Sequence, residues 1–418
     1  MIEIKPLHRC DAIIAVPGSK SYTHRALILS SLAKGESVLA HALRSEDTEH
    51  TARGLLEFGV EIFWKGDDVR VLGTGGKLKA LKGRIDVGNS GTSMRFLTAL
   101  AALKKGITLL DGNERMRKRP IGELLSGLGE LGVRAYSQEG NGFPPVIVES
   151  EGLKGGTARI NGEESSQFLS GLLMVAPYAQ KDVNIQVAGS LASRPYVDIT
   201  LAAMSSFGVG IRNQGYRSFF IQAGQHYLPQ KYWIEGDASN ASYFFSAAAV
   251  SRGKVEVKNL NPASIQGDLR FLGILERMGC RVNRRSDLVE VQGGELDGIE
   301  IDMNEMPDLV PTLAVTAAFA HGRTVIQNIR HLRLKESDRI HALALELSKM
   351  GIRVNEREDG LEIEGGRPHG AEIETYDDHR MAMSFAIAGL AVPGIRIKGE
   401  RCVDKSFPEF WETLQNLY

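Results

Sequence analysis

Cysteine is scarce in this sequence, and long apolar runs are missing. The three cysteines, Cys10, Cys280 and Cys402, lie far apart in 418 residues, which excludes a disulfide framework and a CxxC pair and is typical of a reducing compartment. No stretch approaches the roughly 18 apolar residues of a membrane span. The first apolar run, residues 12–16, is too short for a secretory signal peptide. We therefore expect a cytoplasmic protein with no membrane partner.

An excess of charge of one sign is missing as well. The chain carries 50 Lys and Arg residues against 51 Asp and Glu, a formal net charge of -1, so we expect no nucleic-acid partner held by an overall basic field. Apolar residues make up 43% and charged residues 24%, which excludes disorder, collagen and a coiled coil as descriptions of the whole chain. A chain of 418 residues is long enough for two or three domains.

Proline is infrequent, with 14 residues, whereas glycine is abundant, with 46, so the glycine excess indicates tight turns rather than linkers. The pattern apolar–Gly–apolar closes an amphipathic helix at intervals of 73, 76, 71 and 72 residues. Its occurrences are Phe58-Gly59-Val60, Leu131-Gly132-Val133, Phe207-Gly208-Val209, Met278-Gly279-Cys280 and Met350-Gly351-Ile352. The amphipathic segment 407–418 stands where a sixth such helix is expected.

A second type of helix recurs with the same period and is apolar on all sides, so we expect it to be buried. Its examples are residues 26–35, 94–106, 167–179, 241–253, 312–322 and 381–394. Short alternating runs, such as 255–260 and 324–329, are typical of strands.

These repeats are too many for one core. Six units, each with two helices and a few strands, predict two domains of three units each. The repeat pattern is interrupted near Val16-Pro17 and between residues 227 and 235. We therefore predict a discontinuous domain 1, residues 1–15 plus 230–418, and a domain 2, residues 16–229.

Cations and small polar residues gather at the predicted helix starts. A cation at the positive end of a helix is unfavourable unless an anion lies beside it, so many such ends on one face predict a phosphate or carboxylate site. A single cation of this kind is more often simply solvated, but one fold places successive repeat starts together. The residues concerned are Lys20, Arg25, Arg95, Arg115, Arg117, Arg119, Arg194, Lys335, Arg339, His379, Arg380 and Lys405, with Ser19, Ser21, Asn89, Ser165, Ser166, Gln167 and Ser193.

Two acids, Asp308 and Glu336, stand among these cations. Neighbouring cations stabilise a carboxylate, which suits a proton shuttle or an anchor for a substrate hydroxyl. Helix capping for Asp308 and a surface ion pair for Glu336 are the alternatives.

The remaining motifs are weak. GSKS at 18–21 lacks the order of a P-loop, and no GxGxxG follows a strand. The DDH at 377–379 has no second cluster with ligand spacing, so we expect no metal and instead an N-cap role for Asp377 or Asp378. Cys402 has no base beside it in the sequence, and we expect a buried thiol.

Ten phrases in order, from about Pro17 to Phe410, resemble the 5-enolpyruvylshikimate-3-phosphate synthase family of enolpyruvyl transferases. They are PGSKSYTHRAL, GNSGTSMR, DGNERMRKRPI, SSQFLSGLLM, SRPYVDITL, GDASNASYF, DMNEMPDLVPTLAV, LKESDRI, TYDDHRMAM and CVDKSFPEF. The resemblance implies an α/β (α+β) fold, an inside-out α/β barrel of two domains with six βαβαββ repeats, three per domain. Substrates would bind in the cleft between the domains.

The resemblance also implies an activity. The enolpyruvyl group of phosphoenolpyruvate would pass to the 5-hydroxyl of shikimate 3-phosphate through a tetrahedral intermediate that releases phosphate. The step belongs to chorismate and aromatic amino-acid biosynthesis. The family implies no cofactor, no metal, a monomer and the target of glyphosate.

Site residues carried over from the family fall into overlapping sets. Shikimate 3-phosphate would contact Lys20, Ser21, Arg25, Ser165, Ser166, Gln167, Ser193, Tyr196, Asp308 and Lys335. Phosphoenolpyruvate would contact Lys20, Asn89, Gly91, Arg119, Gln167, Arg339, His379, Arg380 and Lys405. The acid–base pair would be Asp308 and Glu336, with Lys20 and Lys405 as further candidates for proton transfer.

Three positions bear on how closely the family pattern holds. His331 stands where many relatives carry Asn beside shikimate, and it is not assigned as a ligand. Gly91 is the small residue associated with glyphosate-sensitive members, which predicts sensitivity. Phe96 stands where Pro is common and would change the shape of the pocket.

Two other functions compete with this one. The sister enzyme that transfers enolpyruvate to UDP-N-acetylglucosamine carries Lys-Asn near its N-terminus and a cysteine on a mobile loop. Here the pair is Lys20-Ser21, and residues 105–120 contain no cysteine. A non-catalytic protein that binds phosphorylated ligands would keep the arginines but would not need Asp308, Glu336 and Lys405 together.

Overall fold

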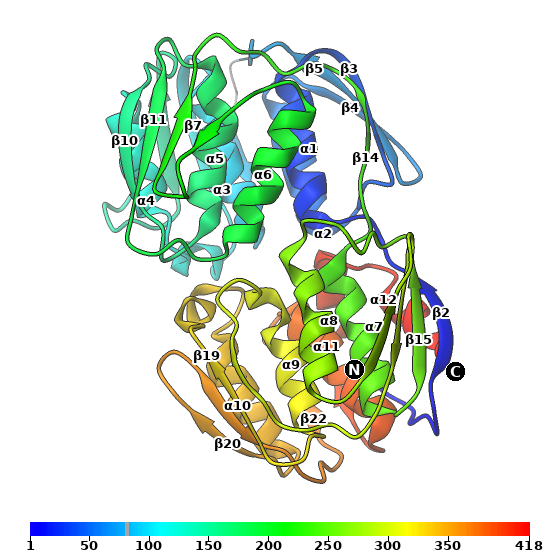
Figure 1. Ribbon diagram of the computed structural model, residues 1–418. Coiled ribbons are helices and arrows are strands. Elements are labelled where there is room, and N and C mark those ends of the chain that lie inside the picture. Colours follow the sequence, from blue (N-terminus) through cyan, green and yellow to red (C-terminus); the bar gives the residue numbers. More distant parts are fainter. Residues whose placement is uncertain (80–82) are drawn as a thin grey trace. The chain divides into compact units, whose positions relative to one another are not determined.

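The computed structural model describes residues 1–79 and 83–418, which divide into two compact units (Figure 1). One unit comprises Met1–Pro17 and Glu235–Tyr418, and the other comprises Gly18–Ile234, each with its own apolar core. Strand β14 (Lys231–Trp233) pairs in parallel with β3 (Lys34–Ala40) of the Gly18–Ile234 unit. The second border between the units therefore lies after Ile234 rather than before residue 230.

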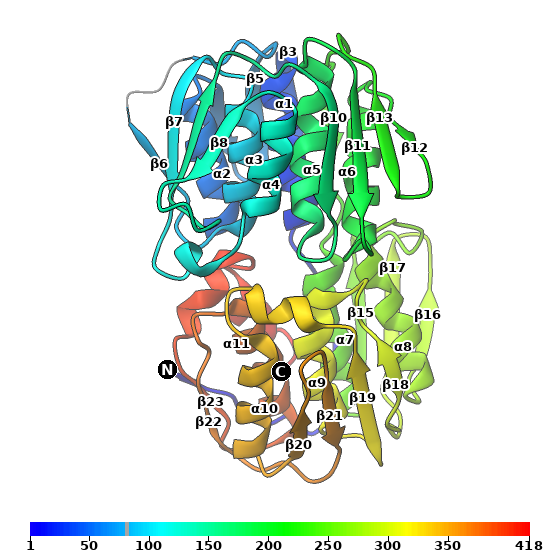
Figure 2. The same cartoon turned by 90° about the vertical axis from the view of Figure 1, so that its left-hand side faces the viewer.

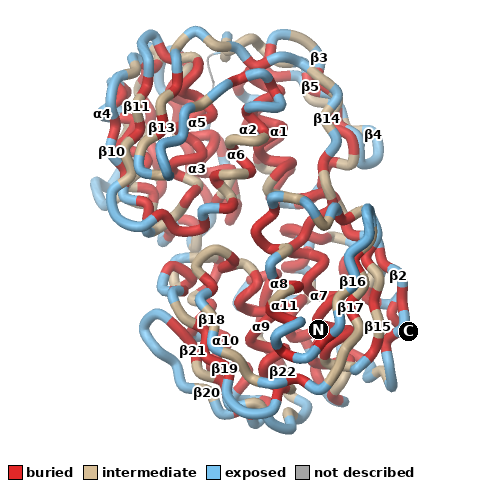
Figure 3. Tube along the Cα trace, viewed as in Figure 1, coloured by how far each residue is buried: buried red, intermediate tan, exposed pale blue. Residues whose placement is uncertain are grey.

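The helices expected to be buried form at each predicted place, and nearly all their residues are buried (red in Figure 3). Their apolar and small side chains cover the whole circumference, so each helix can be surrounded by protein. Within a unit they pack on one another, as α3 does on α5 and α7 on α11. They are α1 (Lys20–Leu32), α3 (Gly91–Ala101), α5 (Ser166–Val175), α7 (Ala238–Val250), α9 (Val310–Ala317) and α11 (His379–Ala391).

The amphipathic helices alternate with the buried ones along the chain. They are α2 (Glu46–Glu57), α4 (Gly122–Glu130), α6 (Arg194–Ser206), α8 (Phe271–Arg277), α10 (Arg339–Lys349) and α12 (Phe410–Gln415). The last of them confirms the helix predicted within residues 407–418.

The apolar–Gly–apolar pattern marks one kind of helix end. After α2, the Gly59 N–H donates to the Leu56 carbonyl (2.9 Å) and the Val60 N–H to the Leu55 carbonyl (3.1 Å), with Gly59 at φ +84°. This is a Schellman turn, in which glycine adopts the left-handed conformation without a clash and the next apolar residue returns to the core. Gly132, Gly208, Gly279 and Gly351 end their helices in the same way.

The sheets of each unit lie around its buried helices (Figure 2). In the sheet of β6 (Arg84–Asp86), β7 (Gly106–Asp111), β9 (Val146–Ser150) and β8 (Arg134–Ser137), β7 pairs in parallel with β6 and antiparallel with β9. The same order recurs in the sheets β10-β11-β13-β12, β14-β3-β5-β4, β2-β15-β17-β16 and β18-β19-β21-β20. The runs predicted as strands at 255–260 and 324–329 correspond to β15 (Lys254–Lys258) and β19 (Arg323–Gln327).

The remaining strands of these sheets have the following bounds. They are β10 (Gly156–Asn161), β11 (Val183–Ala188), β13 (Ser218–Ile221), β12 (Arg212–Asn213), β5 (Asp68–Thr74), β4 (Glu61–Lys65), β2 (Asp11–Ala15), β17 (Leu288–Gln292), β16 (Arg281–Arg284), β18 (Glu300–Asp302), β21 (Leu361–Glu364) and β20 (Arg353–Glu356).

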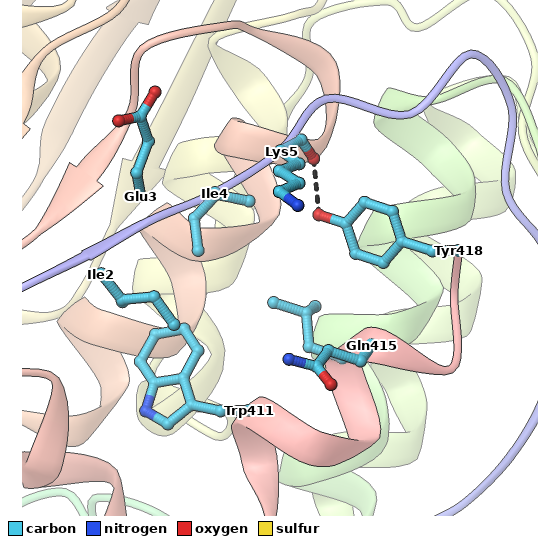
Figure 4. A pocket seen from close by; sticks show the side chains of 8 residues that line it. Ile2, Glu3, Ile4, Lys5, Trp411, Gln415 and Tyr418 are labelled. Atoms are coloured by element: carbon cyan, nitrogen blue, oxygen red, sulfur yellow. Dashed lines mark hydrogen bonds between the residues drawn. The ribbon is translucent and has the colours of Figure 1, made fainter.

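The last repeat differs from the others. Over the described residues its sheet has three strands, β1 (Ile2–Glu3), β23 (Arg396–Ile397) and β22 (Glu372–Ile373). Beside β1, the Tyr418 hydroxyl donates to the Lys5 carbonyl (2.5 Å), and a cavity of about 480 Å³ lies between β1 and α12 (Figure 4). In four other repeats the outer strand of the hairpin packs against the second helix, as β20 does against α10. The cavity thus takes the place of that strand, and none of the predicted site residues lines it.

None of the described helices is both long enough and apolar enough to cross a membrane.

Candidate active site

Most predicted site residues of each unit lie at or near the starts of helices, where unpaired N–H groups and the helix dipole favour anions. The exceptions are Arg119 and Lys335, which follow short 3-10 helices, and Lys405, which ends one. In the Gly18–Ile234 unit they are Lys20, Ser21, Arg25, Asn89, Gly91, Arg119, Ser165, Ser166, Gln167, Ser193 and Tyr196. In the other unit they are Asp308, Lys335, Glu336, Arg339, His379, Arg380 and Lys405.

Arg25 contacts two other residues that are predicted to bind shikimate 3-phosphate, Ser21 and Tyr196. It is buried in α1, where its Nη1 donates to the Ser21 carbonyl (2.9 Å) and its Nη2 to the Tyr196 carbonyl (2.9 Å). Its Nε donates to Thr200 Oγ1 (2.7 Å), and its guanidinium lies 5.3 Å from the centre of the Phe96 ring. Burial lowers the pKa of Arg25 to about 10, so the side chain stays charged at neutral pH.

A second cluster surrounds the start of α3. Arg119 follows the short helix η1 (Met116–Lys118), and its Nη1 donates to the Asn89 carbonyl oxygen (3.0 Å). A Cβ added to Gly91 would lie only 2.7 Å from Arg119 Cζ, so the guanidinium lies directly against the glycine. Gln167 Nε2 donates to Thr92 Oγ1 (3.0 Å), which joins the start of α5 to that of α3. Residues predicted to bind phosphoenolpyruvate are thus brought together.

The predicted phosphate-binding serines stand at the starts of neighbouring helices. Ser165 caps α5, where its Oγ accepts the Gln167 N–H (3.2 Å), and Ser166 is the first helical residue. Ser193 caps α6 with a left-handed backbone, φ +56°. A non-glycine residue in this conformation costs on the order of 1 kcal/mol and is typical of functional sites. Helices α5 and α6 pack against each other.

In the other unit, Arg339 is surrounded by carboxylates. This first residue of α10 is buried, and it donates to Asp378 Oδ2 (2.8 Å), Asp308 Oδ1 (3.1 Å) and Glu336 Oε2 (2.9 Å). The second oxygen of Asp308 accepts from Arg380 Nη2 (2.6 Å). Burial alone would lower the pKa of Arg339, but the charges of Asp378, Glu336 and Asp308 outweigh it and raise that pKa. Asp308 and Glu336, the two predicted acids, therefore both contact Arg339, which is predicted to bind phosphoenolpyruvate.

Asp378 confirms one expectation and adds a role that the sequence did not reveal. Its Oδ1 accepts the Arg380 N–H (3.0 Å), so it is the N-cap of α11, as expected for Asp377 or Asp378. The same carboxylate also accepts from Ser337 Oγ (2.9 Å) and from Arg339. The only sequence signal was its place in TYDDHRMAM, because its partner Arg339 is 39 residues away.

Burial and neighbouring cations keep His331 neutral. It lies in η5 (Arg330–Leu334), and burial, with the charges of Lys335 and Arg339, lowers the pKa of His331 to about 3. A neutral imidazole can both donate and accept a hydrogen bond. His379, the first residue of α11, and Lys405, the last residue of η6 (Glu400–Lys405), are buried too.

Asp268 is a further acid that the sequence analysis missed. It lies in η3 (Gly267–Arg270), where the Ser239 hydroxyl donates to it. Burial, and then the negative charge of Asp308, raise the pKa of Asp268 to about 7. No local pattern pointed to this residue, because the shift arises from burial among distant segments.

Cysteine and metal chemistry find no support in the described residues. Cys402 is buried, and burial raises the pKa of its thiol to about 12, so the expected buried thiol is confirmed. Within residues 1–79 and 83–418, no group of three or more His, Cys, Asp or Glu side chains could hold a metal ion.

Comparison with known proteins decides the family. The family model described as EPSP synthase (3-phosphoshikimate 1-carboxyvinyltransferase) matches residues 4–414. The chain belongs to the EPSP synthase family. It is 48% identical over 415 residues to the 3-phosphoshikimate 1-carboxyvinyltransferase of Nostoc punctiforme, covering 98% of this chain and 97% of that one. Identity to the enzyme of the same name from Methanoculleus marisnigri is 47%, over 97% of this chain and 96% of that one.

The solved structures agree with this family. The EPSP synthase from Acinetobacter baumannii, solved at 2.37 Å, matches with a TM-score of 0.83 and 29% identity, over 99% of this chain and 97% of that chain. The resemblance stated from the sequence is confirmed, and so is the α/β fold of repeated βα units in two domains.

Proposed function

We propose that this chain transfers the enolpyruvyl group of phosphoenolpyruvate to the 5-hydroxyl of shikimate 3-phosphate and releases phosphate. Membership of the EPSP synthase family supports this transferase activity and its place in aromatic amino-acid biosynthesis. The observation that carries the mechanism is the contact of Asp308 and Glu336 with Arg339, because both acids then accept hydrogen bonds from one buried cation. Transfer to UDP-N-acetylglucosamine is not favoured.

Binding comes first in this mechanism. Both substrates are anions that repel each other, so their approach requires cations and helix N-termini. Both units contain such cations and helix N-termini. That the two sets act on one pair of substrates in an interdomain cleft stays a prediction. Arginine side chains bind phosphate and carboxylate oxygens in pairs, which fixes orientation as well as position.

Asp308 links binding to chemistry. Its two oxygens bridge Arg339 and Arg380 (3.1 and 2.6 Å). The carboxylate of phosphoenolpyruvate offers the same charge and the same pair of oxygens, so it competes with Asp308 for these guanidiniums. A carboxylate released in this way becomes a better proton acceptor for the 5-hydroxyl, because it loses the cations that stabilise its charge.

Two proton transfers accompany the formation of the new bond. The 5-hydroxyl oxygen attacks C2 of phosphoenolpyruvate while its proton passes to a base and another proton is delivered to the methylene carbon. The tetrahedral intermediate then loses a methyl proton and phosphate, which restores the double bond. Asp308 and Glu336 form the acid–base pair, with Lys20 and Lys405 as further candidates for proton transfer. Fixed charges around the site stabilise the intermediate.

The reaction is tested by phosphate release from purified protein and phosphoenolpyruvate, with shikimate 3-phosphate, with UDP-N-acetylglucosamine, or with no acceptor. We expect release only with shikimate 3-phosphate. Release with the nucleotide sugar alone would move the chain to the sister enzyme. Binding of both substrates without release would support a non-catalytic protein.

The acid–base role is tested by Glu336→Gln. The amide oxygen can still accept from Arg339 Nη2, so binding of both substrates should survive, whereas turnover should fall at least about 100-fold. The matched control is Glu358→Gln, which removes an exposed carboxylate paired with Arg330. Equal turnover in the two variants would contradict the assignment, and calorimetry with each substrate measures binding.

Finer properties follow from the family pattern. We infer a monomeric, cytoplasmic enzyme that is sensitive to glyphosate. The sensitivity follows from Gly91, which places no methyl group against the Arg119 guanidinium. Analytical ultracentrifugation measures the oligomeric state, and inhibition of phosphate release by glyphosate in competition with phosphoenolpyruvate measures sensitivity.

A further inference from the structure

Lys20 is bound to a carboxylate that the proposed reaction does not use. Its Nζ lies 3.1 Å from Asp47 Oδ2. The Asp47 side chain is only 3% exposed, and that of Lys20 is 14% exposed. Asp47 stands in the first turn of α2, where the helix dipole favours a negative charge. A charge this deeply buried is retained only with a partner, and Lys20 is one.

Further hydrogen bonds join the same helices one turn deeper. His24, four residues after Lys20, contacts Thr51 Oγ1 (2.8 Å), four residues after Asp47. Thr51 Oγ1 in turn contacts Ser93 Oγ of α3 (2.7 Å), which also donates to the Asp47 carbonyl (3.1 Å). Residues four apart lie on one face of a helix, so these contacts form successive links between α1, α2 and α3.

This network fixes Lys20 relative to the start of α3. Ser93 belongs to the first turn of α3, which begins with Gly91, and Arg119 lies against that glycine. A lysine has a long flexible side chain and a single point charge, so it does not by itself hold a defined position. Asp47 supplies the missing constraint, because it binds the ammonium from a helix that is linked to α3.

We propose that Asp47 is a positioning residue that holds the Lys20 ammonium where it meets both substrates. The proposal rests on the proposed function, in which Lys20 is a substrate ligand. Without the Asp47 charge, the ammonium samples other rotamers and meets the substrates out of place. A misplacement of about 1 Å can lower a rate on the order of 100-fold.

The test is a double-mutant cycle on kcat/KM for phosphoenolpyruvate, with Asp47→Asn, Lys20→Met and the double variant. Asn keeps the shape and one acceptor oxygen but removes the charge. We expect Asp47→Asn to lose at least about 10-fold in the wild-type background and less than about 2-fold in the Lys20→Met background, since it acts through Lys20. Glu46→Gln is the matched control, because it removes the neighbouring but exposed carboxylate of α2 and should change kcat/KM by less than about 2-fold.

The cycle separates this proposal from the proposed function. Wild-type protein that releases no phosphate with shikimate 3-phosphate contradicts the function itself. Where the wild type is active, the proposal is overturned by full activity of Asp47→Asn, by equal losses in both backgrounds, or by full activity of Lys20→Met. Should Asp47→Asn fail to fold, as thermal unfolding would show, Asp47→Ser enters the same cycle with a smaller side chain.

Discussion

At the start of α3, Gly91 leaves room for two guanidinium groups. A Cβ at this position would overlap Arg95 Nη1 and Arg119 Nη2 and would lie 2.7 Å from Arg119 Cζ. Both arginines are buried, and Arg95 Nη2 donates to the Pro120 carbonyl (3.1 Å), next to Arg119. A methyl group at Gly91 would therefore displace both guanidinium groups, including that of Arg119, whose Nη1 donates to the Asn89 carbonyl (3.0 Å).

We therefore expect Gly91→Ala to raise KM for phosphoenolpyruvate about 10-fold, roughly the loss of one good charged hydrogen bond, with a smaller change in KM for shikimate 3-phosphate. Steady-state kinetics with each substrate varied in turn measures this. Gly273→Ala in α8 is the control, since nothing lies within 4 Å of its added Cβ. An unchanged KM for phosphoenolpyruvate in Gly91→Ala would show that Arg119 is not a ligand of that substrate.

Asp268 predicts a pH effect on stability. Its pKa in the folded chain is about 7, whereas an unfolded aspartate has a pKa of about 4. Because the folded pKa is the higher one, the folded state gains stability from this group below about pH 4, and the gain is lost as pH rises through 7. Wild type should therefore lose on the order of 3 kcal/mol between pH 4 and pH 8 that Asp268→Asn does not lose.

Urea unfolding at both pH values measures this difference. Asp287→Asn, which removes an exposed carboxylate of the same unit, is the control. Parallel pH profiles for wild type and Asp268→Asn would show that Asp268 is ionised in the folded chain.

At the scale of the element, the helix-ending turn explains the period of the sequence. After α4, Gly132 has φ +84°, and its N–H and that of Val133 donate back to Gly129 and Leu128 (3.0 Å each). The atoms that a Cβ at Gly132 would meet all belong to the flexible side chain of Lys154. The requirement for glycine is therefore mainly conformational.

Gly132→Ala should lower the free energy of unfolding by about 1 to 2 kcal/mol, the penalty of a left-handed conformation for a residue with a Cβ. Gly129→Ala is the comparison, because Gly129 lies within α4, three residues before Gly132, with open space around its added Cβ and an ordinary backbone. It should leave stability unchanged or raise it by up to about 1 kcal/mol. Denaturant unfolding of both variants provides the comparison, and equal stabilities would contradict the conformational argument.

At the scale of the whole molecule, chain continuity distinguishes the two units. Residues 18–234 form one unbroken segment whose sheets close within it, because β14 pairs with β3. The other unit needs residues 1–17, since β2 pairs with β15 and β1 with β23. Removal of that segment leaves two sheets without a strand each.

A fragment of residues 18–234 should therefore fold alone and unfold cooperatively in urea, monitored by circular dichroism. The fragment 235–418 should not do so until residues 1–17 are restored by fusion or as a peptide. Cooperative unfolding of 235–418 alone would show that β1 and β2 add little to its core.

The sequence determined those features that depend on neighbours within a few residues. Apolar periodicity identified the buried and amphipathic helices, and glycine after an apolar residue marked each Schellman turn. The acids before α11 narrowed its cap to Asp377 or Asp378. Such signals act within one or two helical turns, so they can be recognised from residues that are close together in the sequence. The family resemblance likewise rested on contiguous phrases.

Only the tertiary structure decided which distant residues meet. Asp47 and Lys20 are 27 residues apart, Asp378 and Arg339 are 39 apart, and Asp308 and Arg380 are 72 apart. The assignment of β14 to the sheet of β3 and the cavity beside β1 arose in the same way. These contacts depend on how whole repeats pack, and packing sums many weak interactions that no local pattern of residues records.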